Sequence, residues 1–396
     1  MADRAETQSR IDAALRCAVE VGEVPGVVAM AGTADDTLYE GAFGVRDPAR
    51  GPAMTLDTVF RIHSMTKAIT SVAAMQLVEE GRLALEAPVP DIGEKALNDP
   101  QVLEGFDAAG APILRPARRP ITLRHLLTHT AGFTYEVWNA DTLRYVEATG
   151  APRFNSGRRA ALNRPLAFDP GERWEYGINI DWAGRIVEEL SGWNLDEYIR
   201  ERICVPLGMD DTSYVPSVPQ QARLAGAHQR MPDGTLVVQE LPPPAMPEFF
   251  GGGGGLYSTG RDYLRFLRML LNGGSLDGAR VLRPDTVALM NRNHIGDLAA
   301  GTLTSYAPEM SNDVDFFPGA ALRWGLGYMI NLERGPNGRS AGTLSWAGLR
   351  NSYYWLDPTA GVAGVILTQI LPFADPAVLR LLGEFERGVY ALAEAR

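Results

Sequence analysis

The residues with the clearest chemical potential are Ser64 and Lys67, which stand three positions apart. A serine hydroxyl is a weak nucleophile until a neighbouring group removes its proton. Side chains three positions apart on a helix lie on one face, so the amine of Lys67 can reach the hydroxyl of Ser64. Free backbone N–H groups at a helix start also favour negative charge on a substrate oxygen. The spacing therefore predicts a nucleophile, its base and part of an oxyanion site in one short element.

The use of lysine at position 67 is informative. Of the 37 Lys and Arg residues, only Lys67 and Lys95 are lysines. An arginine stays protonated, whereas a lysine amine accepts a proton once burial lowers its pKa. The apolar residues within 68–75 predict a half-buried setting for Lys67, while Lys95 has no motif around it and is expected at the surface. The spacing alone leaves an alternative open, in which Ser64 only caps a helix and Lys67 is solvated.

Patterns for other chemistry are absent or weak. No Gly-x-Ser-x-Gly segment occurs, which argues against an α/β-hydrolase. The histidines lack His-Glu-x-x-His spacing, and no glycine-rich segment ends as a phosphate-binding loop does. His125 and His129 stand four apart and could pair as metal ligands, but hydrogen-bonded structural roles are the favoured interpretation. We expect no metal and no organic cofactor.

The elements that must position Ser64 and Lys67 follow from the residue patterning. A strong helix is predicted over Met65–Glu80, with Gly81 as its C-terminal cap. Strand patterns near both chain ends predict an α+β fold, in which one antiparallel sheet is built from both ends and flanked by helices. The end elements are a helix over 9–23, strands Val27–Gly32, Thr37–Phe43, Ser352–Leu356 and Val362–Thr368, and a final helix Pro376–Glu394.

The chain divides by pattern into two domains. Residues 1–85 and 250–396 are predicted to form the sheet domain, and residues 86–249 a mostly helical inserted domain with long loops. The loop 241–255 ends in five consecutive glycines, which permit close backbone approaches that side chains would block. We expect this loop and the segment 105–160 to supply pocket walls; a flexible linker is the alternative for the loop.

Composition limits the classes of partner. The net charge of −11 gives no electrostatic footprint for nucleic acid or for an anionic membrane surface. No run of 18 apolar residues predicts a membrane-spanning helix, and the amino terminus lacks a signal-peptide layout. Cys17 and Cys204 are too few for a disulfide framework. A cytoplasmic location is expected, and the oligomeric state cannot be predicted.

Several ordered motifs resemble one family over nearly the whole chain. The chain looks like the serine β-lactamase and penicillin-binding-protein fold group, and is most similar to carboxylesterases related to class C β-lactamases, called family VIII. The resemblance implies that fold and nominates Tyr176 as the tyrosine that shares proton transfer with Lys67. The segments that carry it are 60–67, 123–132, 168–176 continuing through 181–184, 254–259 and 346–348.

Two departures from the β-lactamase pattern bear on the substrate. The third position of the Tyr-x-Asn motif is Ile178, so the amide that contacts a lactam substrate is missing. Trp346 stands where Lys-Thr-Gly or its His variant places a cation that holds a substrate carboxylate. An indole offers one N–H donor and an apolar face but no charge. Both changes suit neutral esters in an apolar pocket.

The resemblance also implies the remaining site residues. The backbone N–H groups of Ser64 and Leu349 would form the oxyanion hole. Tyr135, Trp346, Ala347 and Gly348 would contact the substrate, although a plain packing role for Tyr135 stays open.

The predicted function is cleavage of a small-molecule carboxylic ester through an acyl-enzyme on Ser64, with Lys67 and Tyr176 relaying protons. Three alternatives remain from the sequence. A β-lactamase or D-amino-acid-specific peptidase would share the nucleophile, and an acyltransferase would pass the same acyl group to an alcohol or amine. A binding protein on this fold would use no acyl-enzyme at all.

Overall fold

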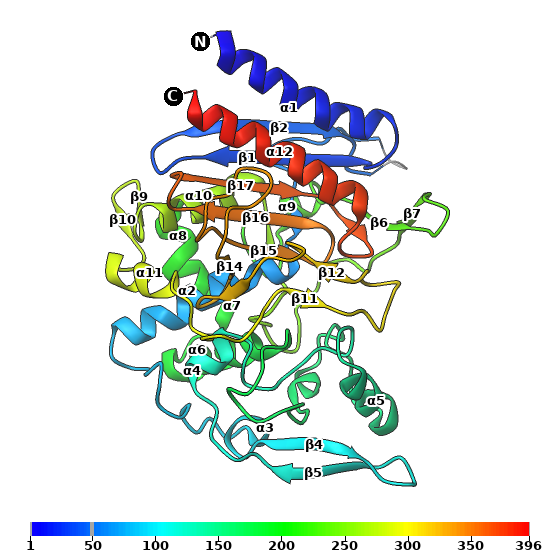
Figure 1. Ribbon diagram of the computed structural model, residues 1–396, viewed down its shortest axis with the longest axis vertical. Helices are drawn as coiled ribbons and strands as arrows, with labels where there is room; N and C mark the ends of the chain where they lie inside the picture. Colours follow the sequence, from blue (N-terminus) through cyan, green and yellow to red (C-terminus); the bar gives the residue numbers. More distant parts are fainter. Residues whose placement is uncertain (1, 48–50, 396) are drawn as a thin grey trace.

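A seven-stranded antiparallel sheet forms the centre of the computed structural model, which describes residues 2–47 and 51–395 (Figure 1). The strand order β13-β14-β15-β16-β17-β1-β2 places the two chain ends side by side, because β1 pairs with β17. The predicted α+β fold with a sheet from both ends is therefore confirmed. The strands are β1 (Gly26–Gly32), β2 (Thr37–Gly44), β13 (Leu322–Trp324), β14 (Met329–Asn331), β15 (Leu344–Gly348), β16 (Ser352–Asp357) and β17 (Val362–Leu367).

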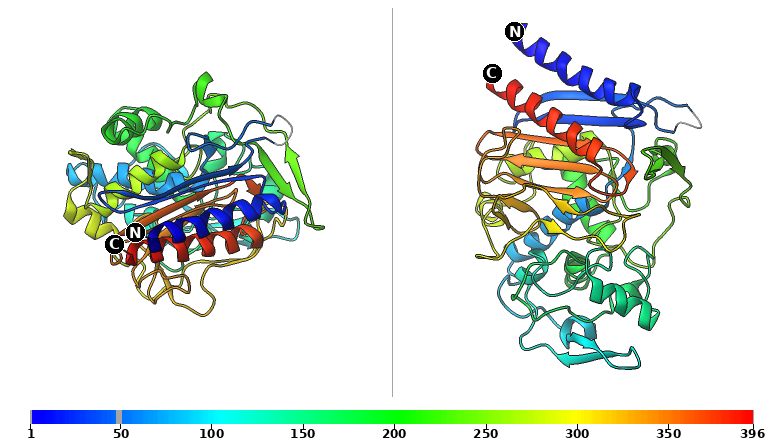
Figure 2. Two further views of the ribbon diagram at one scale, coloured as in Figure 1. Left: turned by 90° about the horizontal axis from the view of Figure 1, so that it is seen from above. Right: turned by 45° about the vertical axis from the view of Figure 1, so that its right-hand side comes forward.

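Helices cover both faces of this sheet (Figure 2). The terminal helices α1 (Ala2–Glu20) and α12 (Pro376–Glu394) lie side by side on one face, while α10 (Gly260–Leu271) and α2 (Thr66–Glu79) lie on the other. The bounds of α12 match the prediction, because Asp375 caps it by accepting the N–H groups of two residues in its first turn. Helix α1 lies earlier in the chain than the predicted 9–23.

The helix that carries Lys67 is buried on all sides. Residues 66–77 of α2 are all buried, so its neighbours on every side fix its position. The prediction placed Ser64 at the start of this helix; instead it lies in a 3-10 turn, His63–Met65, and α2 begins at Thr66. Gly81 follows the helix with φ of 70°, a left-handed conformation that glycine adopts without strain.

The described residues of the segment 86–249 contain seven α-helices, a 3-10 helix (Arg159–Leu162), a π-helix (Arg200–Cys204) and two hairpins. Its first hairpin lies at the end of the molecule farthest from α1 and α12 (Figure 1). The hairpins were not expected from the sequence, and the second joins the C-terminal part because β6 pairs with β18 (Ile370–Leu371). The elements are α3 (Lys95–Asn98), β4 (Gln101–Phe106), β5 (Pro112–Pro116), α4 (Leu123–Leu127), α5 (Ala140–Thr149), α6 (Asn179–Ser191), α7 (Leu195–Ile199), α8 (Val205–Leu207), α9 (Val218–Gln221), β6 (Ala227–Arg230) and β7 (Leu236–Gln239).

Short elements complete the chain. They are β3 (Phe60–Arg61), which pairs with β8 (Tyr257–Ser258), and β9 (Ser275–Leu276), β10 (Ala279–Arg280), α11 (Pro284–Met290), β11 (Thr302–Leu303) and β12 (Val314–Asp315). Cys17 is exposed and Cys204 is buried, and both are free. Over the described residues, no helix combines the length and apolar character needed to cross a membrane.

Candidate active site

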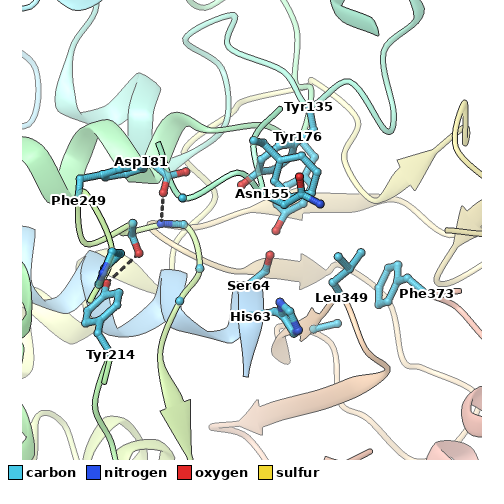
Figure 3. Close-up of a pocket in the computed structure, with 18 of the residues that line it drawn as sticks. His63, Ser64, Tyr135, Asn155, Tyr176, Asp181, Tyr214, Phe249, Leu349 and Phe373 are labelled. Carbon is cyan, nitrogen blue, oxygen red and sulfur yellow. Dashed lines mark hydrogen bonds between the residues drawn. The ribbon is translucent and has the colours of Figure 1, made fainter. Parts of the chain in front are cut away.

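A cavity of about 320 Å³ opens beside Ser64 between the sheet and the segment 86–249. Its walls come from four parts of the chain, 63–64, 135–181, 214–257 and 346–373, and most of its lining side chains are aromatic or apolar (Figure 3). The segments 105–160 and 241–255, which were expected to supply pocket walls, contribute Trp138, Phe154, Asn155, Phe249 and four glycines of 251–255; Asp181, Tyr214 and Phe373 also line the cavity.

The amine of Lys67 is fully buried and has three polar neighbours. Its Nζ lies 3.2 Å from Ser64 Oγ, 3.0 Å from Tyr135 Oη and 2.6 Å from the Gly253 carbonyl oxygen. Burial lowers the pKa of Lys67 to about 7, while the charge of Asp181 acts in the opposite direction. A neutral amine has two N–H donors and one lone pair, so it can donate to Tyr135 and Gly253 and accept the proton of Ser64.

The turn that presents Ser64 is held in an uncommon conformation. His63, directly before it, has φ of 45°, which is rare for a residue with a side chain. The chain on either side is fixed, because the N–H of Ile62 donates to Leu256 at 3.0 Å and the carbonyl of Met65 accepts from Tyr263 at 2.9 Å. Ser64 itself is only partly buried and lines the cavity (Figure 3), and its hydroxyl accepts a hydrogen bond from Lys67 Nζ at 3.2 Å.

Tyr176 also lies close to the amine. Its hydroxyl accepts a hydrogen bond from Trp346 Nε1 at 3.0 Å, and its ring centroid is 4.7 Å from Nζ of Lys67. Burial raises the pKa of Tyr176 above its ordinary value, although hydrogen bonding to Ser64 and Trp346 opposes the shift. Tyr176 therefore carries its proton at neutral pH, and Lys67 is the group in this pair that can accept one.

Tyr135 is the second tyrosine at the base. Its hydroxyl accepts directly from Lys67, and its backbone N–H donates to the carbonyl of Tyr176 at 3.3 Å. Burial raises the pKa of Tyr135 as well. Its ring contacts Phe154, with centroids 4.8 Å apart, and Tyr135 lines the cavity. The sequence reasoning placed Tyr135 against the substrate and did not anticipate its bond to the lysine.

The third position of the tyrosine motif, Ile178, supplies no amide to the cavity. Ile178 is buried and does not line it. The side chain of Asn179 turns away, donating to the Phe133 carbonyl at 2.8 Å and lying 3.1 Å from Nδ1 of His129. His129 thus has the structural role that the sequence suggested. Within residues 2–47 and 51–395, no three His, Cys, Asp or Glu side chains are grouped to hold a metal ion.

The end of β15 lies against the nucleophile turn. Trp346, Ala347 and Leu349 line the cavity, and Gly348 lies below them against the chain before Ser64. A Cβ at Gly348 would lie 2.5 Å from the Ile62 carbonyl oxygen, so glycine is required for this close approach. The approach brings Leu349 and Ser64 to the same cavity, as an oxyanion hole from these two residues requires, and Gly348 is not among the residues that line this cavity.

Asp181 and the glycine run are the site features that the sequence reasoning did not assign to chemistry. Asp181 follows Tyr176 by five residues and lies in the first turn of α6. Its place at a helix start, shortly after the tyrosine motif, is the sequence feature that could have pointed to Asp181. The sequence could not identify its partner, because Gly253 is 72 positions away in the chain.

Comparisons with known proteins show the family of this chain. The beta-lactamase family model matches residues 11–386. Monacolin J acid methylbutanoyltransferase of Aspergillus terreus is 35% identical, over 96% of this chain and 95% of its own length. Lovastatin esterase of Penicillium rubens is 31% identical, over 96% of this chain and 98% of its own.

Solved structures give the same result. A simvastatin synthase from Aspergillus terreus, the LovD6 mutant, superposes with a TM-score of 0.84 at 32% identity, covering 99% of this chain and 96% of its own. The family model covers most of the chain, and relatives above 30% identity span nearly all of it. The chain therefore belongs to the beta-lactamase family.

Proposed function

We propose that this protein is a serine carboxylesterase of the family VIII type, which cleaves small esters through an acyl-enzyme on Ser64. The observation that carries the proposal is the buried Lys67 amine, 3.2 Å from Ser64 Oγ and with its pKa lowered to about 7. A base of that pKa is part neutral and part protonated near neutral pH, which suits repeated proton transfer. A solvated lysine, as in the alternative interpretation of the spacing, would remain charged.

The reaction follows from these positions. Lys67 takes the proton of Ser64 as its oxygen attacks the ester carbonyl, and the N–H groups of Ser64 and Leu349 stabilise the oxyanion. Tyr176 then donates its proton to the departing alkoxide and regains one from the Lys67 ammonium. Water, deprotonated by the same pair, attacks the acyl-enzyme; the bond to Ser64 Oγ breaks, the acid leaves, and the pair returns the proton to Ser64.

The cavity favours a neutral, apolar ester. Trp346 presents an uncharged indole whose N–H is already donated to Tyr176, and no amide side chain extends from Ile178. Aromatic walls from Trp138, Phe154 and Phe373 offer apolar contact instead. These features support ester cleavage over β-lactam or D-amino-acid peptide cleavage.

Transfer of the acyl group to an alcohol is the second candidate. The relatives named above include both a methylbutanoyltransferase and an esterase. Both reactions share the acyl-enzyme and differ only in the acceptor that attacks it. The ratio of acid to new ester formed in the presence of a competing alcohol measures the balance.

A fluorophosphonate probe tests the shared step, because it modifies only an activated serine. We expect labelling of the native protein and none of Ser64→Ala, together with hydrolysis of short p-nitrophenyl esters by the native protein alone. Ser9→Ala, the same change at an exposed serine of α1, is the matched control and should label normally. Absence of labelling in the native protein would contradict the proposal and favour a binding protein.

A further inference from the structure

A buried carboxylate faces the glycine run at the cavity wall. Asp181 is only 7% exposed, and its Oδ1 accepts the backbone N–H of Gly253 at 2.9 Å (Figure 3). The carboxylate of Asp181 takes no part in the proposed acyl-transfer steps. Burying a carboxylate is unfavourable unless its interactions compensate, so its placement here needs a reason.

Gly253 connects this carboxylate to the catalytic base. Its N–H binds Asp181, and its carbonyl accepts from Lys67 Nζ at 2.6 Å. The direction of that carbonyl decides where one N–H of the amine points. With a second N–H directed to Tyr135, the lone pair is left for Ser64.

The glycines permit this close approach. A Cβ at Gly253 would overlap the carboxylate of Asp181, and a Cβ at Gly252 would lie 2.5 Å from the Ile180 carbonyl oxygen. A Cβ at Gly254 would meet nothing nearer than 3.7 Å. Glycine is therefore needed at positions 252 and 253, where the loop contacts α6, and less so at position 254.

A second anchor ties the same loop to the helix that carries the base. The hydroxyl of Thr70, one turn after Lys67 on α2, donates to the Gly252 carbonyl at 2.8 Å. Thr70 is fully buried and uncharged. The loop is thus held from both sides, by a charge on α6 and by a hydroxyl on α2.

We propose that Asp181 is a positioning residue for the base: it holds Gly253 so that the Gly253 carbonyl orients the Lys67 amine, and its negative charge sets how readily that amine takes the Ser64 proton. The inference rests on the proposed function, because it presumes attack by Ser64.

The two effects on the amine have opposite signs. Burial favours neutral Lys67, and the negative charge of Asp181 favours the ammonium form. Removing the charge while keeping the hydrogen bond must therefore lower the pKa of Lys67. The other titratable or charged groups that act on Lys67 or Asp181 are His63, His129, Tyr135, Tyr176, Tyr214 and Arg164.

The test is the rate of fluorophosphonate labelling of Ser64 in the full chain, from about pH 5 to about pH 9. Asp181→Asn keeps an oxygen for the Gly253 N–H but loses the charge. The labelling rate should fall at low pH as Lys67 becomes protonated, and this fall is the acid limb of the pH profile. We expect the midpoint of the acid limb of Asp181→Asn to move down by about one pH unit, because an opposite charge within a few ångströms shifts a pKa by about 1–3 units. A limb that coincides with the native one would overturn the role of the charge.

Thr70→Val tests positioning without touching any charge. We expect labelling to slow by about tenfold or more at every pH, because small misplacement of a catalytic group can cost about a hundredfold, while the limb stays in place. Native rates in this variant would overturn the role of the loop, whether or not Asp181→Asn folds.

Asp262→Asn is the matched control for the carboxylate. Asp262 on α10 is also buried and also accepts a backbone N–H, from Asp211 at 2.8 Å, but it does not line the cavity. Its limb should match the native one, and an equal shift there would overturn a specific role for Asp181. A native protein that is not labelled contradicts the proposed function, whereas native labelling with an unshifted Asp181→Asn limb contradicts this inference alone.

Discussion

Two pairs of buried opposite charges lie beside the same cavity, and they differ in how completely they are satisfied. In the first, Arg164 Nη1 contacts Glu136 Oε2 at 2.7 Å, with both side chains 1% exposed. The remaining donors and acceptors also have partners: Arg164 donates to the carbonyls of Ala161 and Pro152, and Glu136 accepts the N–H of Phe154. This pair, Arg164 and Glu136, holds the segment that carries Phe154 at the cavity, and we call the pair the clamp.

The second pair is Lys67 and Asp181, which are both buried. Within the described part of the chain, these two side chains are not in direct contact as an ion pair. Their connection runs through Gly253, and burial lowers the pKa of Lys67 to about 7. A directly paired charge with hydrogen-bond partners on both side chains serves the structure. A buried charge held one residue away from its partner can change protonation state, as catalysis requires.

The largest expected effect is on the Lys67 side of this comparison. Lys67→Arg should lower kcat/KM for a p-nitrophenyl ester by about 10⁴-fold, because a guanidinium cannot accept the Ser64 proton. The variant should still fold, as circular dichroism can check. Lys95→Arg makes the same change at the other lysine, which is exposed, and should be fully active. Activity of the Lys67 variant near the native level would exclude Lys67 as the base.

Substitution of Glu136 should lower the free energy of unfolding rather than the activity. Glu136→Gln leaves Arg164 buried without a counter-charge, which costs about 3–5 kcal/mol of unfolding free energy. Urea unfolding measures this loss. The acid limb of the surviving activity should stay in place, because the clamp does not set the charge of Lys67. A stable variant with a shifted limb would reverse the assignment of the two pairs.

Substitutions of Tyr176 and Tyr135 distinguish the roles of the two tyrosines beside Lys67. Tyr176→Phe should reduce the acylation rate by about a hundredfold, because it removes the proton donor to the leaving group. Tyr135→Phe removes only one acceptor of the amine, and we expect about a tenfold loss. Stopped-flow measurement of alcohol release reports acylation directly. A larger loss in Tyr135→Phe would transfer the donor role to Tyr135.

The pH dependence of kcat/KM of the native protein should reflect the titration of Lys67. Lys67 acts as a base only when neutral, and burial lowers its pKa to about 7. The value of kcat/KM should therefore fall by about tenfold per unit below pH 7 and level off above it. Because the pKa of Tyr176 is raised above its ordinary value, this group should cause no alkaline fall below about pH 10. A flat profile down to pH 5 would contradict a titrating Lys67.

The sequence predicts what local spacing encodes. Lys67 lies within three residues of Ser64, so helix geometry brings them together, and the Asp-Pro start of the final helix defines its cap. The contacts that convert Lys67 into a base are long-range: Tyr135 is 68 positions away and Gly253 is 186. No periodicity reports such pairings.

The misplaced elements have similar causes. The 3-10 turn at Ser64 shares its residue pattern with a helix start, so the predicted helix began too early. The hairpin β6–β7 lacks the alternation that marks a strand, because β6 is mostly polar and β7 has exposed valines at two successive positions, Val237 and Val238.

The smallest expected effect lies where the two pairs meet, at the wall held by the clamp. The N–H of Phe154 is bound to Glu136, and its ring contacts Tyr135 in the cavity. Phe154→Ala should enlarge the cavity and raise KM for short acyl esters a few-fold while kcat stays close to native, because the base and nucleophile keep their positions. Longer acyl chains should be affected less, since they can fill the new space. If kcat fell with KM unchanged, the clamp would be part of the proton-transfer apparatus, and the division between a structural and a chemical charge pair would fail.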